Sequence, residues 1–427
     1  MTHQPENEQK PAKKGFRHHA RKVHGRVTKY LYEKDTIFAT IWVFIFIVAL
    51  GSIPLNLGIM NPLKLGLKDF DFNDISYSKL GKSQNTPLDS NIVVINIGNA
   101  DREGIALMID KVASFKPKVM GLDVTFNGAR DPIKDSILRE TIRRNKNLVL
   151  AAKYLVDSTD KLIAAENFFL KDGSQYGYVN FPNDDKETVR AYHPFKKDDK
   201  DKQLILPSFS STLVKLYDST AYKKIEEKAD KRLIINYTRT VTDRKKQYFL
   251  IEGEDLLIQD IDSSVIDGKI ALLAYVNIEP TDIDDKKFTP MNEKFAGKSW
   301  PDMNGIFVHA NIISMVLEKN YIKKVPLWGN LLLAILVCWL HMSFFIHYYL
   351  ESHIWFHLAA KIAQVLSALF FVWLGIYLYD KYRLKVDMKM SLIVIVLAVD
   401  VIYFYEAWAV WMHKKFGFKT VFKPHHH

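Results

Sequence analysis

The chain has 427 residues, of which 48% are hydrophobic and 25% charged, and its formal net charge at pH 7 is +11. The positive excess does not indicate a nucleic-acid-binding protein, because much of it lies near the two ends of the chain, beside long apolar runs. The single cysteine, Cys338, lies within one of these runs, so the sequence excludes disulfide bonds within the chain and cysteine-based metal sites.

Four apolar segments have the length of roughly 20 residues that a helix needs to cross a bilayer. The predicted spans are residues 37–56, 325–346, 357–379 and 390–412. Basic residues crowd the tails that flank them, 1–36 and 413–427, and such flanks stay in the cytoplasm. We therefore expect both ends inside, residues 57–324 in the periplasm, and a multi-pass protein of a bacterial inner membrane. A cleaved signal peptide is the alternative for the first span, but its length favours an uncleaved anchor.

The middle of the chain opens with a strand–helix–strand pattern. Residues 91–98 and 118–126 are almost continuous apolar runs, typical of strands buried on both faces. Apolar residues recur at helical spacing between them, and Pro117 is expected to end that helix. This pattern predicts a parallel βαβ unit. Weaker patterns follow, including a hairpin around Asn183 and Asp184 and a helix at residues 306–317 that leads into the second span.

The predicted fold is thus an α/β extracytoplasmic domain, with a mixed, largely parallel sheet flanked by helices, plus four transmembrane helices. The segments IVVINIGNADREGIALMIDKVASFKPKVMGLDVTF, GYVNFPNDDKETVRAYHPF, LPSFSSTLVKLY, RLIINYTR and IDGKIALLAYV occur in that order. In this order they resemble the CHASE-type sensory domains of type two, found outside the inner membrane in bacterial receptors. The resemblance covers about residues 37–412.

Members of that family typically have one span before the domain and three after it, as expected here. The resemblance therefore implies a sensory function. Such receptors usually continue into a cyclase, kinase or diguanylate-cyclase domain, whereas about 15 residues follow Met412 in this sequence. We accordingly expect the output to pass through a separate protein.

Ligands of open α/β sheets bind beyond the carboxyl ends of the strands, where this sequence places several polar residues. The candidate ligand-binding residues are Asn99, Asp101, Asp123, Arg190, Asn277, Asp284 and Asp285. The carboxylates suit a divalent cation or a cationic ligand. In the alternative interpretation, Asp101 caps a helix, Asp123 holds a turn, the acidic loop is solvated, and Arg190 forms a structural ion pair. His309 is either a pH sensor or a packed histidine.

The sequence contains no Gly-x-Ser-x-Gly elbow, Walker-type loop, His-Glu-x-x-His or dinucleotide fingerprint. We therefore expect no catalytic residues, no cofactor and no metal site, and hence no enzyme. The three histidines at the end of the chain are attributed to a tag or a disordered end.

Polar residues inside spans are costly, so each needs a partner or a function. The candidates are Lys361, Asp400, Glu406 and His341. We predict a pair between Lys361 and Glu406. Asp400 is expected to hydrogen-bond within the bundle, for example to His341, or else to contact a partner's span or belong to a proton path.

Taken together, the patterns predict a non-enzymatic sensor or scaffold whose periplasmic domain binds a ligand or a protein and couples to the C-terminal three-helix bundle. The expected partners are the lipid bilayer and other membrane or cytoplasmic subunits, or further copies of the chain, but not nucleic acid. One alternative is a docking subunit of an envelope complex. Another is a proton-coupled membrane component that uses Asp400.

Overall fold

The structure is a computed structural model with two compact units. The helical unit contains Met1–Ile59, Lys324–Leu378 and Leu384–His427, and the α/β unit contains Met60–Lys323 and Tyr379–Arg383. The residues that the structure describes are 30–52, 71–78, 86–156, 162–172, 175–182, 188–197, 205–229, 231–242, 245–279, 281–292, 300–351 and 353–422. The terminal histidines, and therefore the prediction about them, lie outside these residues.

Among the described residues, four helices are long and apolar enough to cross a membrane. They are α2 (Lys34–Ser52), α11 (Leu327–Glu351), α12 (His353–Tyr382) and α13 (Lys389–Phe416). Their apolar sequence favours helices in a bilayer, where every backbone group must be bonded within the protein. α12 is the least covered: 17% of its apolar window is buried, against 50% in α11 and 44% in α13.

The chain turns back after α13. Gly417 adopts the left-handed conformation (φ 70°) that ends many helices, and the following residues return to the start of α2. There the buried carboxylate of Asp35 accepts hydrogen bonds from the Tyr405 hydroxyl at 2.6 Å, from Thr420 Oγ1 at 2.8 Å and from the Val421 amide at 2.8 Å. The first and last spans are therefore joined by a polar contact inside this unit.

The α/β unit is built on a seven-stranded sheet of order β10-β1-β11-β2-β3-β4, with β5 also paired to β3. Its strands are β1 (Ile92–Asn96), β2 (Val119–Asp123), β3 (Leu148–Val156), β4 (Leu162–Glu166), β5 (Gln175–Tyr178), β10 (Phe249–Glu252) and β11 (Ile270–Ala274). Every pairing is parallel except β3 with β4. The predicted mixed α/β fold with a largely parallel sheet is confirmed, although β11 lies between the two strands of the predicted βαβ unit.

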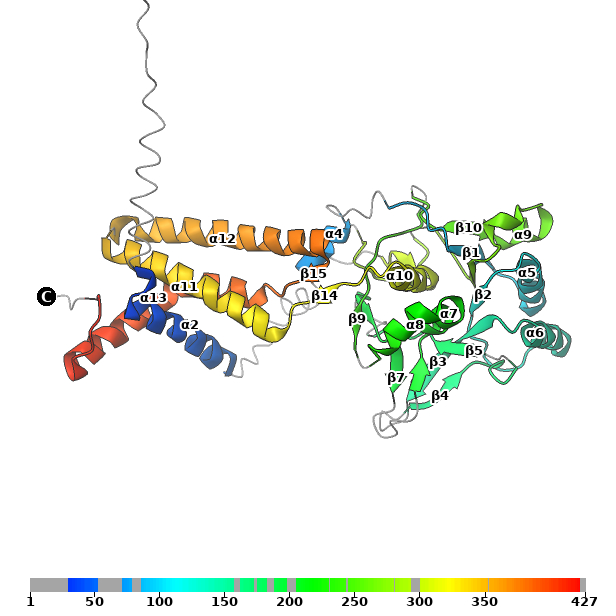
Figure 1. Ribbon diagram of the computed structural model, residues 1–427, viewed down its shortest axis with the longest axis horizontal. Helices are drawn as coiled ribbons and strands as arrows, with labels where there is room; N and C mark the ends of the chain where they lie inside the picture. The colour runs from blue at the N-terminus through cyan, green and yellow to red at the C-terminus, as the bar shows by residue number, and fades with distance from the viewer. Residues whose placement is uncertain are drawn as a thin grey trace, which may run out of the picture. The chain divides into compact units, whose positions relative to one another are not determined.

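Helices cover both faces of the sheet (Figure 1). α5 (Arg102–Ser114), α6 (Pro132–Arg144) and α9 (Gly253–Ile258) pack on one face, and α7 (Phe209–Tyr217), α8 (Ser219–Glu226) and α10 (Gly305–Leu317) on the other. In β1, Val93 and Ile95 pack on the face covered by α5, α6 and α9. Ile92 and Val94 pack on the face covered by α7, α8 and α10. This alternation follows from the two-residue period of a strand and explains the continuous apolar runs in the sequence.

The turn of the predicted hairpin, at Asn183 and Asp184, lies outside the described residues, and the described segments on either side of it pair with other strands. β5 pairs in parallel with β3, and β6 (Ala191–Tyr192) pairs antiparallel with β9 (Leu233–Ile234). Further short elements are η2 (Phe72–Asp74), α4 (Ile75–Ser78), η4 (Ser263–Val265), β7 (Phe195–Lys197), β8 (Ile205–Pro207), β12 (Lys286–Lys287), β13 (Met303–Asn304), β14 (Lys323–Lys324) and β15 (Leu384–Lys385).

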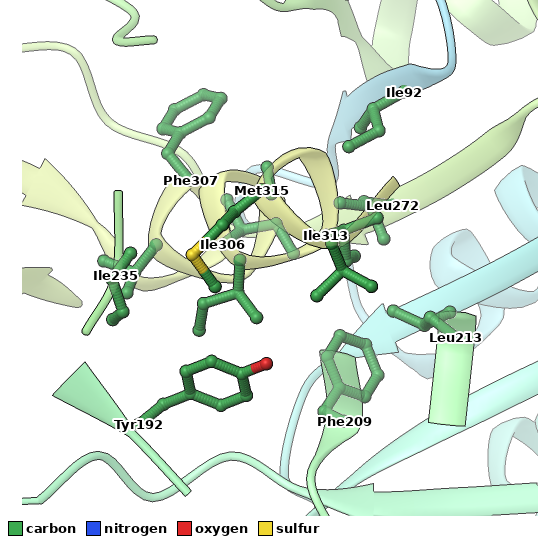
Figure 2. Packing of buried hydrophobic residues seen from close by; sticks show 14 of the residues in the cluster. Ile92, Tyr192, Phe209, Leu213, Ile235, Leu272, Ile306, Phe307, Ile313 and Met315 are labelled. Carbon is green, nitrogen blue, oxygen red and sulfur yellow. The ribbon is translucent and has the colours of Figure 1, made fainter. Parts of the chain in front are cut away.

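The last helix of the α/β unit, α10, runs through the middle of its core. All its residues from Gly305 to Val316 are buried, so the helix has no solvent-facing side. Figure 2 shows Ile306, Phe307, Ile313 and Met315 of α10 between two sets of side chains. On one side lie Tyr192 of β6 and Ile235, which follows β9. On the other side lie residues of the sheet and of α7. α10 therefore packs against both layers of the core.

Candidate functional site

Three neighbouring strands end at the same level of the sheet. In the register of β1, β11 and β2, Asn96 pairs with Ala274 and Ala274 with Asp123, and we call these three residues the carboxyl edge. Asn96 Oδ1 closes the edge by accepting hydrogen bonds from the amides of Gly98 at 3.0 Å and Val276 at 2.9 Å. This edge is where parallel α/β sheets commonly bind ligands.

Two of the predicted ligand-binding carboxylates meet at this edge. Burial and, to a lesser extent, the nearby charge of Asp285 raise the pKa of Asp123 to about 7, while Lys287 and Lys153 oppose the shift. Asp285 stands in a left-handed conformation (φ 55°) in the loop before β12. The pair can hold a proton near neutral pH, or a cationic group in place of the proton.

The same edge touches the start of α10. The Asp285 carbonyl accepts a hydrogen bond from the Gly305 amide at 3.0 Å. A carboxylate oxygen of Asp285 lies 3.4 Å from the point where a Cβ on Gly305 would stand. Negative charge is stabilised at the N-terminus of a helix, so the charge on this carboxylate is coupled to α10.

A second carboxylate with a raised pKa lies close by along the chain. Asp302 accepts hydrogen bonds from the amide and hydroxyl of Thr289 at 2.7 and 2.5 Å, and burial raises its pKa to about 7. No pattern in the sequence singled out Asp302, Lys153 or Lys287 as a site residue. Lys153 alone gave a signal, because it interrupts the apolar run of β3.

The remaining predicted site residues in the loops after the strands either bond to nearby residues or are exposed. Asp101 caps α5 by accepting from the Gly104 amide at 2.9 Å, and Lys134 forms an ion pair with it that lowers the pKa of Asp101. The Asn277 amide donates to Asp282, and its oxygen accepts from the Glu279 amide at 2.8 Å. Asn99 and Asp284 are exposed. These four residues do not join Asp123 and Asp285.

Arg190 lies elsewhere in the α/β unit, beside the segment before β1. Its guanidinium Nη2 lies 2.5 Å from Asp74 Oδ2, and its Nε lies 3.0 Å from Asp74 Oδ1. This bidentate pair fixes η2 to the core of the unit. The geometry matches the structural interpretation of Arg190 that the sequence left open.

His309 is packed inside α10. Its Nδ1 lies 2.9 Å from Ser210 Oγ, and its ring contacts Phe181 and Phe209. Burial lowers the pKa of His309 to about 3, so the imidazole remains neutral at physiological pH. The packed interpretation of this histidine therefore holds over that of a pH sensor.

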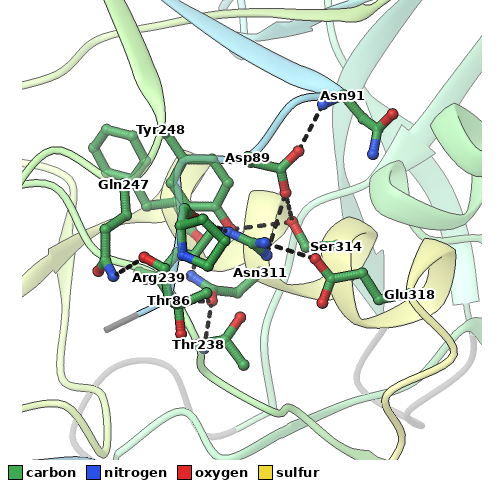
Figure 3. A network of polar contacts seen from close by, with 12 residues as sticks. Thr86, Asp89, Asn91, Thr238, Arg239, Gln247, Tyr248, Asn311, Ser314 and Glu318 are labelled. Atoms are coloured by element: carbon green, nitrogen blue, oxygen red, sulfur yellow. Dashed lines mark hydrogen bonds and ion pairs between the residues drawn. The ribbon is translucent and has the colours of Figure 1, made fainter. Parts of the chain in front are cut away.

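The far end of α10 carries a buried polar network (Figure 3). Arg239 pairs with Asp89 at 3.3 Å and with Glu318 at 2.7 Å, and Ser314 Oγ donates to Asp89 at 2.6 Å. Asn311 accepts from the amides of Thr238 and Arg239 and donates to the Arg239 and Phe307 carbonyls. The network ties α10 to the segments before β1 and after β9, immediately before the chain continues into α11.

The end of α12 belongs to the α/β unit. The hydroxyls of Tyr77 and Tyr379 share a hydrogen bond at 2.5 Å, and their rings meet edge to face. The Lys323 amide donates to the Arg383 carbonyl at 2.7 Å. A small polar pocket opens here, lined by Ser76, Tyr77, Thr86, Tyr237, Thr238, Tyr379, Asp380 and Arg383.

The intramembrane predictions need two corrections. Glu406 accepts a hydrogen bond from the Tyr349 hydroxyl at 2.5 Å, and no ion pair joins it to Lys361 in the described residues. His341 Nδ1 donates to the Val337 carbonyl and its Nε2 lies 3.0 Å from Ser367 Oγ, so His341 does not bond to Asp400. The predicted pair of Lys361 with Glu406 is therefore wrong, and His341 is not the hydrogen-bonding partner of Asp400, whose other interpretations stay predictions.

Among the described residues, no group of three or more His, Cys, Asp or Glu side chains could hold a metal ion. A search of curated proteins and of solved structures found no match to the chain. The model of the CHASE2 domain matches residues 45–344, which include all of Met60–Lys323. With an α/β domain between candidate membrane spans and a family match over most of its length, the chain belongs to the CHASE2 domain family, a family of extracellular sensory domains.

Proposed function

We propose that the protein is a non-enzymatic sensor or scaffold of a bacterial inner membrane. Its α/β unit faces the periplasm, binds a ligand or a protein partner, and alters the C-terminal spans, which act on a separate protein. The single observation that carries this proposal is the position of α10. The helix starts beside the Asp123–Asp285 pair, is buried along its length, and is followed within the same chain by α11.

The proposed orientation rests on charge. Lys414 and Lys415 end α13, and basic residues also fill the segment before α2. Basic flanks are retained in the cytoplasm, so both ends of the chain are assigned there. The α/β unit then lies on the opposite side of the membrane, where a sensory domain meets external ligands.

Neutralising one carboxylate at the carboxyl edge mimics the binding of a cationic ligand there. The substitution therefore tests whether ligand binding changes α10 and the segment that follows it. We expect Asp123→Asn, in the full chain in nanodiscs, to change amide hydrogen exchange in α10 and in residues 318–335 by about tenfold. Asp284→Asn is the matched control, because Asp284 is an exposed carboxylate in the same loop as Asp285. A change confined to residues 119–127 and 281–290 would instead support a docking subunit without signalling.

A further inference from the structure

Two opposite charges lie exposed on the spans. Lys361 of α12 and Asp400 of α13 both have exposed side chains. Neither forms a hydrogen bond or an ion pair with any residue that the structure describes. Charged groups within a bilayer are unfavourable unless they are paired, so this arrangement leaves two groups that need partners.

Two contacts fix the level of these charges. His357 of α12 lies 3.4 Å from the Tyr403 hydroxyl of α13, and Gln364 Nε2 donates to the Val396 carbonyl at 2.9 Å. Lys361 follows His357 by four residues and precedes Gln364 by three. Asp400 precedes Tyr403 by three and follows Val396 by four. Each of the two residues is three or four residues from either contact, so in antiparallel helices Lys361 and Asp400 lie within about one residue, or roughly 1.5 Å, of the same depth, on either side of one seam.

The surface around the two charges is apolar. α13 exposes a stripe at helical spacing, and α12 exposes another that contains Lys361. The large apolar residues of the two stripes are Ile393, Val396, Phe404, Trp411, Ile354, Leu358, Val365 and Leu369. The low coverage of α12 by its own chain leaves this face open.

We propose that this face binds a second copy of the same chain. A two-fold axis along the membrane normal keeps every residue at its depth, so Lys361 of each copy meets Asp400 of the other. One patch that carries both signs at one depth is complementary to itself, and both charges are then paired in a medium of low dielectric constant. This interface does not depend on the proposed sensory function.

Charge reversal tests the interface in the full-length chain. Asp400→Lys makes both positions positive, and Lys361→Asp makes both negative. Two differently tagged copies are co-expressed and extracted in mild detergent, and the second tag is quantified after purification through the first. We expect wild-type copies to purify together, each variant to lose its own partner by about tenfold, and the two variants to recover each other. Lys414→Asp, the same reversal at the end of α13, is the matched control and should retain pairing.

Recovery of the mixed pair also shows that both variants fold, since misfolded chains would not bind each other. The proposal is overturned if wild-type copies never purify together, or if either variant retains its own partner as well as the wild type does. It is also overturned if the mixed variants pair no better than each alone. Recovery of a different membrane protein that depends on both charges, without a second copy, would replace the second copy with that partner.

Discussion

Carboxylates of this chain differ in function because they differ in surroundings. Asp35 accepts from three donors and joins the tail to the first span, whereas Asp123 lies beside another carboxylate at the carboxyl edge. Asp400 is exposed on α13 and has no bonded partner among the described residues. A sequence shows each as the same residue type, and only the structure shows that their surroundings differ in burial and in neighbouring groups.

The raised pKa of Asp123 predicts a pH-dependent stability. The folded value of about 7 exceeds the unfolded value of roughly 4, so the folded protein holds the proton more tightly. This stabilisation is complete below about pH 4 and is lost as the pH rises to about 7, on the order of 2–4 kcal/mol. We expect Asp123→Asn to flatten the dependence of the melting temperature on pH between 4 and 8.

The pKa of Asp302 is also raised, so part of the dependence of stability on pH should remain in Asp123→Asn. Asp284→Asn serves as the control, because its exposed side chain should leave the whole profile unchanged. A pH profile of Asp123→Asn parallel to that of the wild type would show that Asp123 titrates normally.

At the scale of elements, α10 is the helix that contacts both the carboxyl edge and the buried network of Arg239. Its N-terminus lies at the carboxyl edge, and its C-terminal half is held by the Arg239 network. A helix buried on all sides cannot move without repacking both layers, so a displacement at one end is transmitted to the other. The length and burial of α10 thus make it the physical link in the proposed function.

The ion pair of Arg239 with Asp89 should be strongly interdependent. Arg239→Ala leaves the Asp89 carboxylate buried without its cation, and we expect a loss of about 3–5 kcal/mol in the free energy of unfolding. The double variant Asp89→Ala/Arg239→Ala should recover part of that loss. Chemical denaturation of the full chain, followed by a probe in the α/β unit, measures both.

Glu318→Ala is the comparison for this pair, since the Glu318 side chain is 36% exposed and its loss should cost less than about 1 kcal/mol. Equal losses for Arg239→Ala and Glu318→Ala would contradict a buried charge as the cause. An additive double variant would show that Asp89 and Arg239 act independently.

At the scale of the whole molecule, a large α/β unit is inserted between the first candidate span and the remaining three. An odd number of crossings separates the α/β unit from each end of the chain. The position of one end relative to the membrane therefore fixes the position of everything else.

Reporter fusions test this topology. We expect alkaline phosphatase, which is active outside the cytoplasm, to be active when fused within the described loop at residues 281–292 and inactive when fused after Phe422. Green fluorescent protein fused after Phe422 should fluoresce, because the proposed orientation, which rests on the basic flanks, puts that end in the cytoplasm. The reverse pattern would place the α/β unit in the cytosol and remove the basis for an extracytoplasmic sensor.

The sequence by itself determined the four candidate spans, the βαβ beginning of the α/β unit and the family. These depend on local apolar periodicity and length, which the bilayer and the strand geometry impose residue by residue. The position of Asp123 at the end of a strand was also predictable, because the buried pattern of that strand is plain in the sequence.

Only the tertiary structure decided which residues meet. β11 enters between β1 and β2 from more than a hundred residues away, and Asp285 reaches Asp123 from a later loop. Glu406 bonds to Tyr349 instead of Lys361, because contacts such as that of Gln364 with α13 set the register of the spans. Such partners are fixed by packing between distant segments, and local periodicity carries no information about that packing.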